Sequence, residues 1–155
     1  MDPVLEALLR EALREAGVAS AEGEVPVGAV LMTAEGRMFT ARNRTAALGR
    51  ASAHAEFLAM EAAASAGGDW RLTGSVLVST LEPCIMCAGL CVLSRVAKIV
   101  YGAPDIRFGA FGSVTDVRLM PGLNHYPLVE GPVAPEVCGN LLRDFFKATR
   151  HTVSG

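Results

Sequence analysis

The sequence predicts one compact domain of the α/β class. Patterns typical of helices and of strands alternate along the chain, as expected when helices pack on a sheet. With 155 residues, of which 51% are hydrophobic and 19% charged, the composition is that of a folded domain and excludes a disordered or collagen-like chain. A domain of this size buries roughly 68 to 70% of its unfolded surface, so its core needs no disulfide bonds. We therefore expect a single domain over residues 1–155, without a repeat or a linker.

The first element is an amphipathic helix. Asp2 can cap it, with Pro3 at the first helical position. The apolar residues that follow recur with a helical period; they are Val4, Leu5, Leu8, Leu9, Ala12, Leu13 and Ala16. We expect this helix to end near Gly17.

A hairpin and a second helix are expected next. Residues 27–33 and 37–41 flank the turn residues Ala34-Glu35-Gly36, a pattern that predicts two antiparallel strands. A polar, arginine-containing loop covers residues 42–52. Residues 53–66 are rich in Ala, Glu, Met and Leu and are followed by two glycines, which predicts a helix with a glycine terminator.

Strands and helices continue to alternate in the second half of the chain. We expect strands at residues 75–80, 97–101 and 126–129. We expect helices at residues 83–93 and 135–150. Residues 102–124 contain glycines and prolines without a sustained period, which indicates a long functional loop with at most a short helical turn. In the last helix, the residues expected to face inward are Leu141, Leu142, Phe145 and Phe146.

The sequence also bears on location. The longest stretch without a charged residue covers residues 83–94, far short of the roughly 20 apolar residues that span a bilayer. Met1-Asp2-Pro3 has no positive region leading into an apolar run, so we expect neither a signal nor a transit peptide. We expect a cytoplasmic protein with no membrane partner, in which cysteines serve metal or redox chemistry rather than disulfide bonds.

Two short motifs carry chemistry, and each lies at the expected start of a helix. They are His54-Ala55-Glu56 and Pro83-Cys84-Ile85-Met86-Cys87. Cysteines three residues apart at a helix start share one face, where free N–H groups and the helix dipole stabilise thiolates. Together with His54, Cys84 and Cys87 suit tetrahedral Zn²⁺, and three protein ligands leave a fourth position for water, as in catalytic sites.

Other interpretations of the cysteines are open. A Cys-x-x-Cys pair alone is equally typical of a redox pair or of half a structural zinc site. A closed structural site needs a fourth ligand, and Cys91 is the best candidate because it lies on the helix face of Cys87. We favour catalytic zinc because the His54 motif accompanies the cysteines, and we expect Cys91 and Cys138 to be buried small residues.

Glu56 lies two residues from His54 and is not needed for coordination. Zinc can lower the pKa of a water molecule to about 7. A neighbouring carboxylate can then take the proton of that water and pass it to a leaving group. An amidine-like carbon, as in adenine or cytosine, suits this hydrolysis, in which ammonia leaves.

These motifs resemble the bacterial tRNA-specific adenosine deaminases, of the cytidine and deoxycytidylate deaminase superfamily, whose zinc signature is H-x-E followed by P-C-x-x-C. The resemblance covers about residues 22–150, and further segments carry it: Glu24-Val25-Pro26-Val27-Gly28-Ala29-Val30, Asn43-Arg44, Thr80-Leu81-Glu82, Ala88-Gly89, Gly112-Ser113, Pro121-Gly122-Leu123-Asn124-His125 and Asp144-Phe145-Phe146. It implies a three-layer α/β/α fold with a central five-stranded mixed sheet, one Zn²⁺ per chain and a homodimer. The implied substrate is the wobble adenosine of a tRNA anticodon loop, which is converted to inosine.

The resemblance also implies roles for single residues. His54, Cys84 and Cys87 would bind zinc, and Glu56 would be the proton shuttle. Asn43 would hydrogen-bond the flipped base, while Val27 and Leu81 would line its pocket. Asp105 would contact the neighbouring nucleotide, and Phe145 and Phe146 would help to hold the anticodon loop.

Two alternative functions follow from the same residues. Arg50-Ala51-Ser52 and Arg107-Phe108 depart from the usual residues of that family. A site reshaped by these loops would suit a zinc-dependent deaminase of a free nucleobase or nucleoside, such as guanine or cytosine. The other alternative is a zinc-stabilised interaction module without catalysis.

The charge of the chain is unevenly distributed. Its 14 basic and 16 acidic residues give a net charge of −2, which by itself argues against a nucleic-acid partner. Residues 1–36 carry 2 basic and 7 acidic residues, a net −5, whereas residues 37–155 carry 12 and 9, a net +3. Between residues 37 and 50 there are only basic charges, which predicts a basic rim around Asn43 that meets phosphate; its residues are Arg37, Arg42, Arg44 and Arg50.

Overall fold

The computed structural model describes the backbone of residues 1–153 and the side chains of residues 1–150. Within this range, five strands form one mixed sheet in the order β2-β1-β3-β4-β5. The strands are β1 (Gly28–Met32), β2 (Met38–Arg42), β3 (Val76–Leu81), β4 (Lys98–Ala103) and β5 (Leu128–Glu130). β1 pairs antiparallel with β2 and with β3, whereas β3, β4 and β5 run parallel. The predicted hairpin and the predicted mixed sheet are confirmed.

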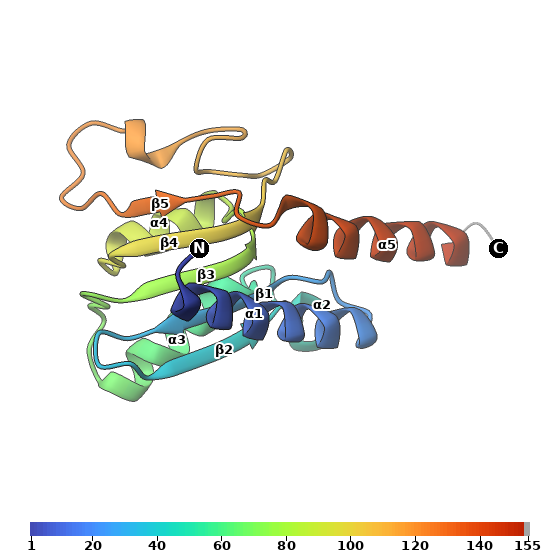
Figure 1. Cartoon of the computed structure of the whole chain (residues 1–155), viewed down its shortest axis with the longest axis horizontal. Helices are drawn as coiled ribbons and strands as arrows, with labels where there is room; N and C mark the ends of the chain where they lie inside the picture. Colours follow the sequence, from blue (N-terminus) through green and yellow to red (C-terminus); the bar gives the residue numbers. More distant parts are fainter. Residues whose placement is uncertain (154–155) are drawn as a thin grey trace.

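Helices cover both faces of the sheet (Figure 1). One layer consists of α1 (Pro3–Ala21) and the beginning of α5 (Pro135–Val153). The opposite layer consists of α3 (Ala55–Gly67) and α4 (Ile85–Leu93). The short helix α2 (Thr45–Leu48) and the 3₁₀ turn η1 (Val117–Leu119) lie in the long loops.

The strand sequences explain this layering. Successive strand residues point to opposite faces of a sheet. Leu31, Leu77 and Ile99 accordingly belong to the core under α3 and α4. Their chain neighbours Val30, Val78 and Val100 belong to the core under α1 and α5. The expected three-layer α/β/α fold is confirmed.

Two local expectations need correction. Asp2 caps α1 as predicted, accepting a hydrogen bond from the N–H of Val4 at 2.7 Å. However, the helix does not end at Gly17 but continues to Ala21, because burial of Ala16 and Ala19 outweighs the roughly 1 kcal/mol that a helical glycine costs. The loop expected over residues 42–52 contains α2.

The last helix differs most from its prediction. α5 packs against the sheet at its beginning, where Cys138 is buried, and then extends beyond the sheet (Figure 1). Leu141, Leu142 and Phe145 are therefore only half-buried, and Phe146 is exposed. The expectation that all four face a core is wrong, because no sheet lies beneath this part of the helix.

Among the described residues, no helix combines the length and the apolar character required to cross a membrane. Of the histidines outside the zinc motif, His125 has its Nε2 atom 2.6 Å from the carbonyl oxygen of Val96, and the side chain of His151 lies outside the described residues.

Candidate metal centre and active site

Two helix starts bring the three expected metal ligands together. His54 is the N-cap residue of α3 and Cys84 is that of α4, both with extended backbone, while Cys87 lies in the first turn of α4. The Nδ1 atom of His54 is 3.5 Å from the sulfur of Cys84 and 3.8 Å from that of Cys87. All three donor atoms lie within 4.8 Å of one another. One imidazole nitrogen and two sulfurs at this spacing fit a Zn²⁺ ion, the metal that this donor set favours.

The electrostatics of the three ligands also suit a cation. A hydrogen bond from the Cys87 thiol, reinforced by His54, lowers the pKa of Cys84 to about 4. The same hydrogen bond raises the pKa of Cys87, which keeps the proton of the pair. The hydrogen bond to Cys84 raises the pKa of His54. A thiolate is thus already present for a metal to bind.

Glu56 lies in the first turn of α3, beside the ligands and almost fully buried, with 4% of its surface exposed. Burial raises the pKa of this carboxyl to about 7. A carboxyl group with a pKa near neutrality can both accept and release a proton during a reaction. The geometry therefore suits Glu56 to proton transfer next to the metal position.

Cys91 lies outside the ligand group. Its sulfur is buried and contacts the sulfur of Met60 at 3.8 Å, and burial raises the pKa of its thiol. Within the described residues, the candidate metal cluster comprises His54, Cys84 and Cys87. The arrangement is that of an open, three-ligand site.

The structure brings Asn43 and Val27 to the start of α3. The side-chain oxygen of Asn43 accepts a hydrogen bond from the N–H of Ala55 at 2.8 Å, next to His54. The N–H of Asn43 donates to the carbonyl of Val27 at 3.0 Å. Val27 is buried, and Leu81, at the end of β3, is half-buried against both cores. Asn43 and Val27 are thus connected to the helix start that carries His54, and Leu81 ends the strand that leads to Cys84.

Asp105 reaches the site from the loop after β4. Its side-chain oxygen accepts hydrogen bonds from the N–H groups of Arg107 and Phe108, at 3.0 and 3.2 Å. Its negative charge is close enough to His54 to contribute to the raised pKa of the imidazole. Asp105 therefore shapes this loop, and its charge adds to the electrostatic environment of His54.

Phe145 and Phe146 lie apart from the ligand group, on the projecting helix. Their rings contact each other edge to face, with centroids 5.4 Å apart. α5 itself contacts α1, β3 and β4. The structure thus does not bring these two residues together with the metal ligands.

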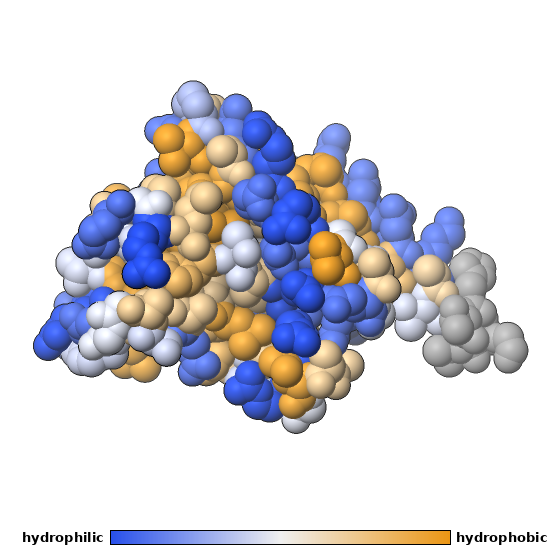
Figure 2. Space-filling model, turned by 90° about the horizontal axis from the view of Figure 1, so that it is seen from below, coloured by the Kyte–Doolittle hydropathy of each residue, from blue (hydrophilic) through white to orange (hydrophobic). Residues whose placement is uncertain are grey.

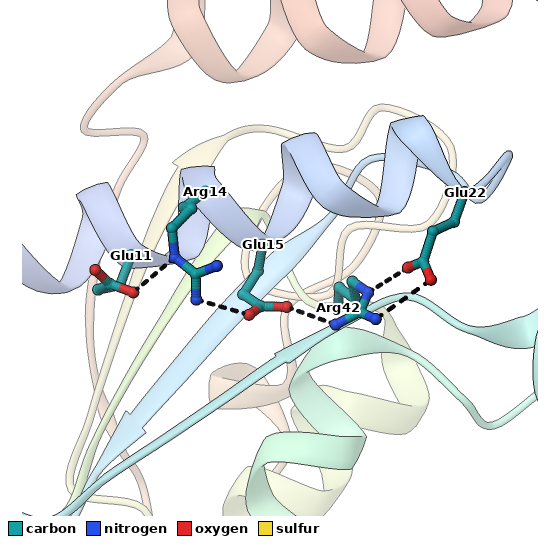
Figure 3. Close-up of polar contacts among 5 residues, drawn as sticks. All are labelled: Glu11, Arg14, Glu15, Glu22 and Arg42. Atoms are coloured by element: carbon teal, nitrogen blue, oxygen red, sulfur yellow. Dashed lines mark hydrogen bonds and ion pairs between the residues drawn. The ribbon is translucent and has the colours of Figure 1, made fainter.

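The expected basic rim is smaller than the sequence suggested. Arg42 forms ion pairs with Glu15 and Glu22 of the first helix and its end, in a chain of charges that continues through Arg14 to Glu11 (Figure 3). Arg37 stacks on Phe39 at 5.1 Å. Acids distant in sequence thus pair with Arg42, which leaves less free positive charge in the rim than the sequence suggested.

Sequence reasoning gave no role to Glu24 and Glu82, two buried carboxylates that hold the loops of the site. Glu24 accepts hydrogen bonds from the N–H groups of Ala46 and Ala47, at 3.1 and 2.8 Å, and so caps α2. Glu82 accepts hydrogen bonds from the loop that contains Asp105. For Glu82, the signal in the sequence that could have indicated a role was an acidic residue within an otherwise apolar segment, directly before the cysteine motif.

Comparisons with known proteins agree with this site. The cytidine and deoxycytidylate deaminase zinc-binding region matches residues 3–103. The tRNA-specific adenosine deaminase of Bacillus subtilis is 43% identical over 145 residues, which cover 94% of this chain and 90% of that protein. A structure from a study of A-to-I editing by tRNA:A34 deaminases at the wobble position superposes with a TM-score of 0.82 and 37% identity, covering 88% of this chain and 99% of that one.

A guanine deaminase structure from Bacillus subtilis shares the fold, with a TM-score of 0.63 at 23% identity, covering 97% of this chain and 95% of that one. At this identity the likeness concerns the fold alone. The matching family region contains both ligand-bearing helix starts. The chain therefore belongs to the family of zinc-binding deaminases that includes the bacterial tRNA-specific adenosine deaminases.

Proposed function

We propose that this chain is a zinc-dependent hydrolase that deaminates adenosine to inosine at the wobble position of a tRNA anticodon loop. The observation that carries this proposal is the open group of His54, Cys84 and Cys87 with the buried carboxyl of Glu56 beside it. The similarity to tRNA-specific adenosine deaminases over nearly their whole length supports the choice of substrate.

His54, Cys84 and Cys87 would hold one Zn²⁺ ion. When bound, this ion lowers the pKa of a water molecule to about 7. Glu56 takes one proton from the attacking water and delivers it to the ring nitrogen. It then takes the proton of the resulting hydroxyl group and delivers it to the exocyclic amine, which leaves as ammonia. Water and adenosine are thereby converted to inosine and ammonia, and Glu56 ends in its starting state.

The remaining residues would hold the flipped nucleotide. Asn43 is positioned by its bond to Ala55 and would hydrogen-bond the base edge, with Val27 and Leu81 as apolar walls. Asp105 would contact the neighbouring nucleotide. Phe145 and Phe146, which project from the sheet on α5, would hold the anticodon loop by stacking.

The assembly that we propose is a homodimer, in the cytoplasm where tRNA is processed. Large apolar side chains are exposed on α4 and near η1. In Figure 2, hydrophobic residues gather in patches between hydrophilic ones on the face of the molecule shown there. Exposed apolar surface of this kind is typical of protein interfaces.

A substrate comparison tests the proposed function. The protein is incubated with an anticodon stem-loop that carries adenosine at the wobble position, and separately with adenine, guanine, cytosine and their nucleosides. We expect inosine in the stem-loop. Ammonia release from a free base or nucleoside, without inosine in the RNA, would instead support the alternative deaminase.

Two glutamate variants on α3 test whether Glu56 takes part in the reaction. Glu56→Gln should lower the deamination rate by roughly 10²- to 10⁴-fold, because the proton shuttle is lost, while zinc stays bound. Glu61→Gln removes an exposed carboxyl from the same helix and should leave the rate unchanged. An unchanged rate in Glu56→Gln would contradict the shuttle role of Glu56. A wild-type protein that binds zinc but deaminates none of the substrates would favour the non-catalytic zinc module.

A further inference from the structure

Glu82 is a buried carboxylate with an unusual set of partners. It directly follows β3, two residues before Cys84, and only 1% of its surface is exposed. Its oxygens accept hydrogen bonds from the N–H groups of Asp105, Phe111 and Ser113, at 3.2, 3.0 and 3.2 Å, and from the hydroxyl of Ser113. All of these donors belong to one loop, which we call the 105–113 loop. A buried charge is stable only when such donors compensate it.

The 105–113 loop is also attached to the ligand segment itself. Gly109 forms an antiparallel β-bridge with the metal-ligating Cys84. The N–H of Ala110 donates to the carbonyl of Pro83 at 2.9 Å. A side chain at position 109 would place its Cβ 2.4 Å from the Glu82 carboxyl group, so the loop can approach this closely only with glycine there. Loop and ligand segment therefore form one packed unit around the Glu82 carboxylate.

The same carboxylate holds the substrate end of the loop. It bonds the backbone of Asp105, whose own side chain fixes the N–H groups of Arg107 and Phe108. A single buried group thus sets the distance between a metal ligand, Cys84, and the residue proposed to touch the nucleotide, Asp105.

We infer that Glu82 is a positioning residue of the deaminase site, which fixes the 105–113 loop to the ligand Cys84 so that metal and substrate contacts keep one geometry. The role toward substrate rests on the proposed function. Glutamine cannot replace Glu82 in this role, because its amide group would present N–H donors to N–H donors and leave some of them unpaired.

The test compares zinc-loaded Glu82→Gln with the wild-type protein by two independent measurements. The first is the rate of zinc transfer to a chromogenic chelator, which needs no substrate. The second is the separation of KM and kcat for the stem-loop RNA. We expect zinc transfer about tenfold faster and KM about tenfold higher, with a smaller change in kcat, as is usual when a group that orients metal ligands is altered.

Two serine variants supply a milder probe and its control. Ser113→Ala removes one hydroxyl donor to Glu82 and should shift both quantities in the same direction, by less. Ser75→Ala removes a buried hydroxyl that donates to the carbonyl of Leu72 at 2.6 Å, just before β3 and thus at the opposite end of that strand from Glu82. It should lower the Tm but change neither zinc transfer nor KM.

The inference is overturned if Glu82→Gln only lowers the Tm, as Ser75→Ala does, because its role would then be structural. If Glu82→Gln does not fold, Ser113→Ala decides the question by the same two measurements. If the wild-type protein does not deaminate RNA, the proposed function fails, while zinc transfer still tests whether Glu82 fixes the ligand segment.

Discussion

Single residues in this chain obtain their chemistry from their position at helix starts. Cys84 and Cys87 reach one imidazole nitrogen because both lie at the beginning of α4. Cys91, one turn further along the same helix, is instead buried against Met60. Cys84 and Cys87 thus belong to the metal site and Cys91 to the core, although all three cysteines lie within less than two helical turns.

This division predicts different effects of alanine at the three cysteines. Cys84→Ala and Cys87→Ala should each lose zinc and lower the Tm, because two protein ligands no longer hold the metal firmly. Cys91→Ala should keep one zinc per chain and lose only packing. Metal analysis of the purified proteins, together with thermal unfolding, checks this, and zinc loss in Cys91→Ala would contradict the three-ligand site.

At the scale of elements, the position of α1 depends on a glycine in β1. A Cβ atom at Gly28 would lie 1.9 Å from the carbonyl oxygen of Ala12, so α1 contacts the strand backbone directly. Gly17, within α1, has open space around its Cα atom. The two glycines therefore have opposite consequences for stability, although neither has an unusual backbone angle.

Alanine substitutions measure this difference. Gly28→Ala should lower the free energy of unfolding by about 1 to 3 kcal/mol, because α1 must move away from the sheet. Gly17→Ala should raise it by about 0.5 to 1 kcal/mol, because alanine favours the helix. Chemical denaturation gives both values, and equal stability of the two variants would mean that α1 does not pack as described.

At the scale of the whole molecule, the sheet is covered on both faces but the outer surface is not uniformly polar. Exposed apolar side chains occur on α4, at Ile85 and Leu93, and near η1, at Leu119 and Met120. The ion pairs of Figure 3, by contrast, lie where α1 meets β2. The proposed dimer would bury the apolar surface that the single chain leaves exposed.

Charge placed on this surface tests the dimer. The wild-type protein should have the mass of two chains by light scattering. Leu93→Arg should shift it toward the mass of one chain, because a charge would be buried in the interface. Val4→Arg, at another exposed apolar position, on α1, should leave the mass unchanged. A wild-type protein with the mass of one chain would contradict the proposed assembly.

The sequence alone predicted most elements, because helix and strand periodicity and glycine terminators are local signals. It missed the end of α1 and the presence of α2, since burial of Ala16 and Ala19 and the capping of α2 by Glu24 both depend on distant parts of the chain. The metal ligands could be predicted from two short motifs whose spacing is set by helix geometry.

The sequence by itself thus determined the α/β class, the metal-ligand candidates and the carboxyl group of Glu56 beside them, since each follows from residues close in the chain. Only the tertiary structure decided that Arg42 is neutralised by Glu15 and Glu22, and that α5 extends beyond the sheet. It alone decided that Glu82 holds the 105–113 loop. The reason is physical. Ion pairs, loop docking and burial join residues that are far apart in sequence, and such contacts cannot be predicted from the spacing of neighbouring residues.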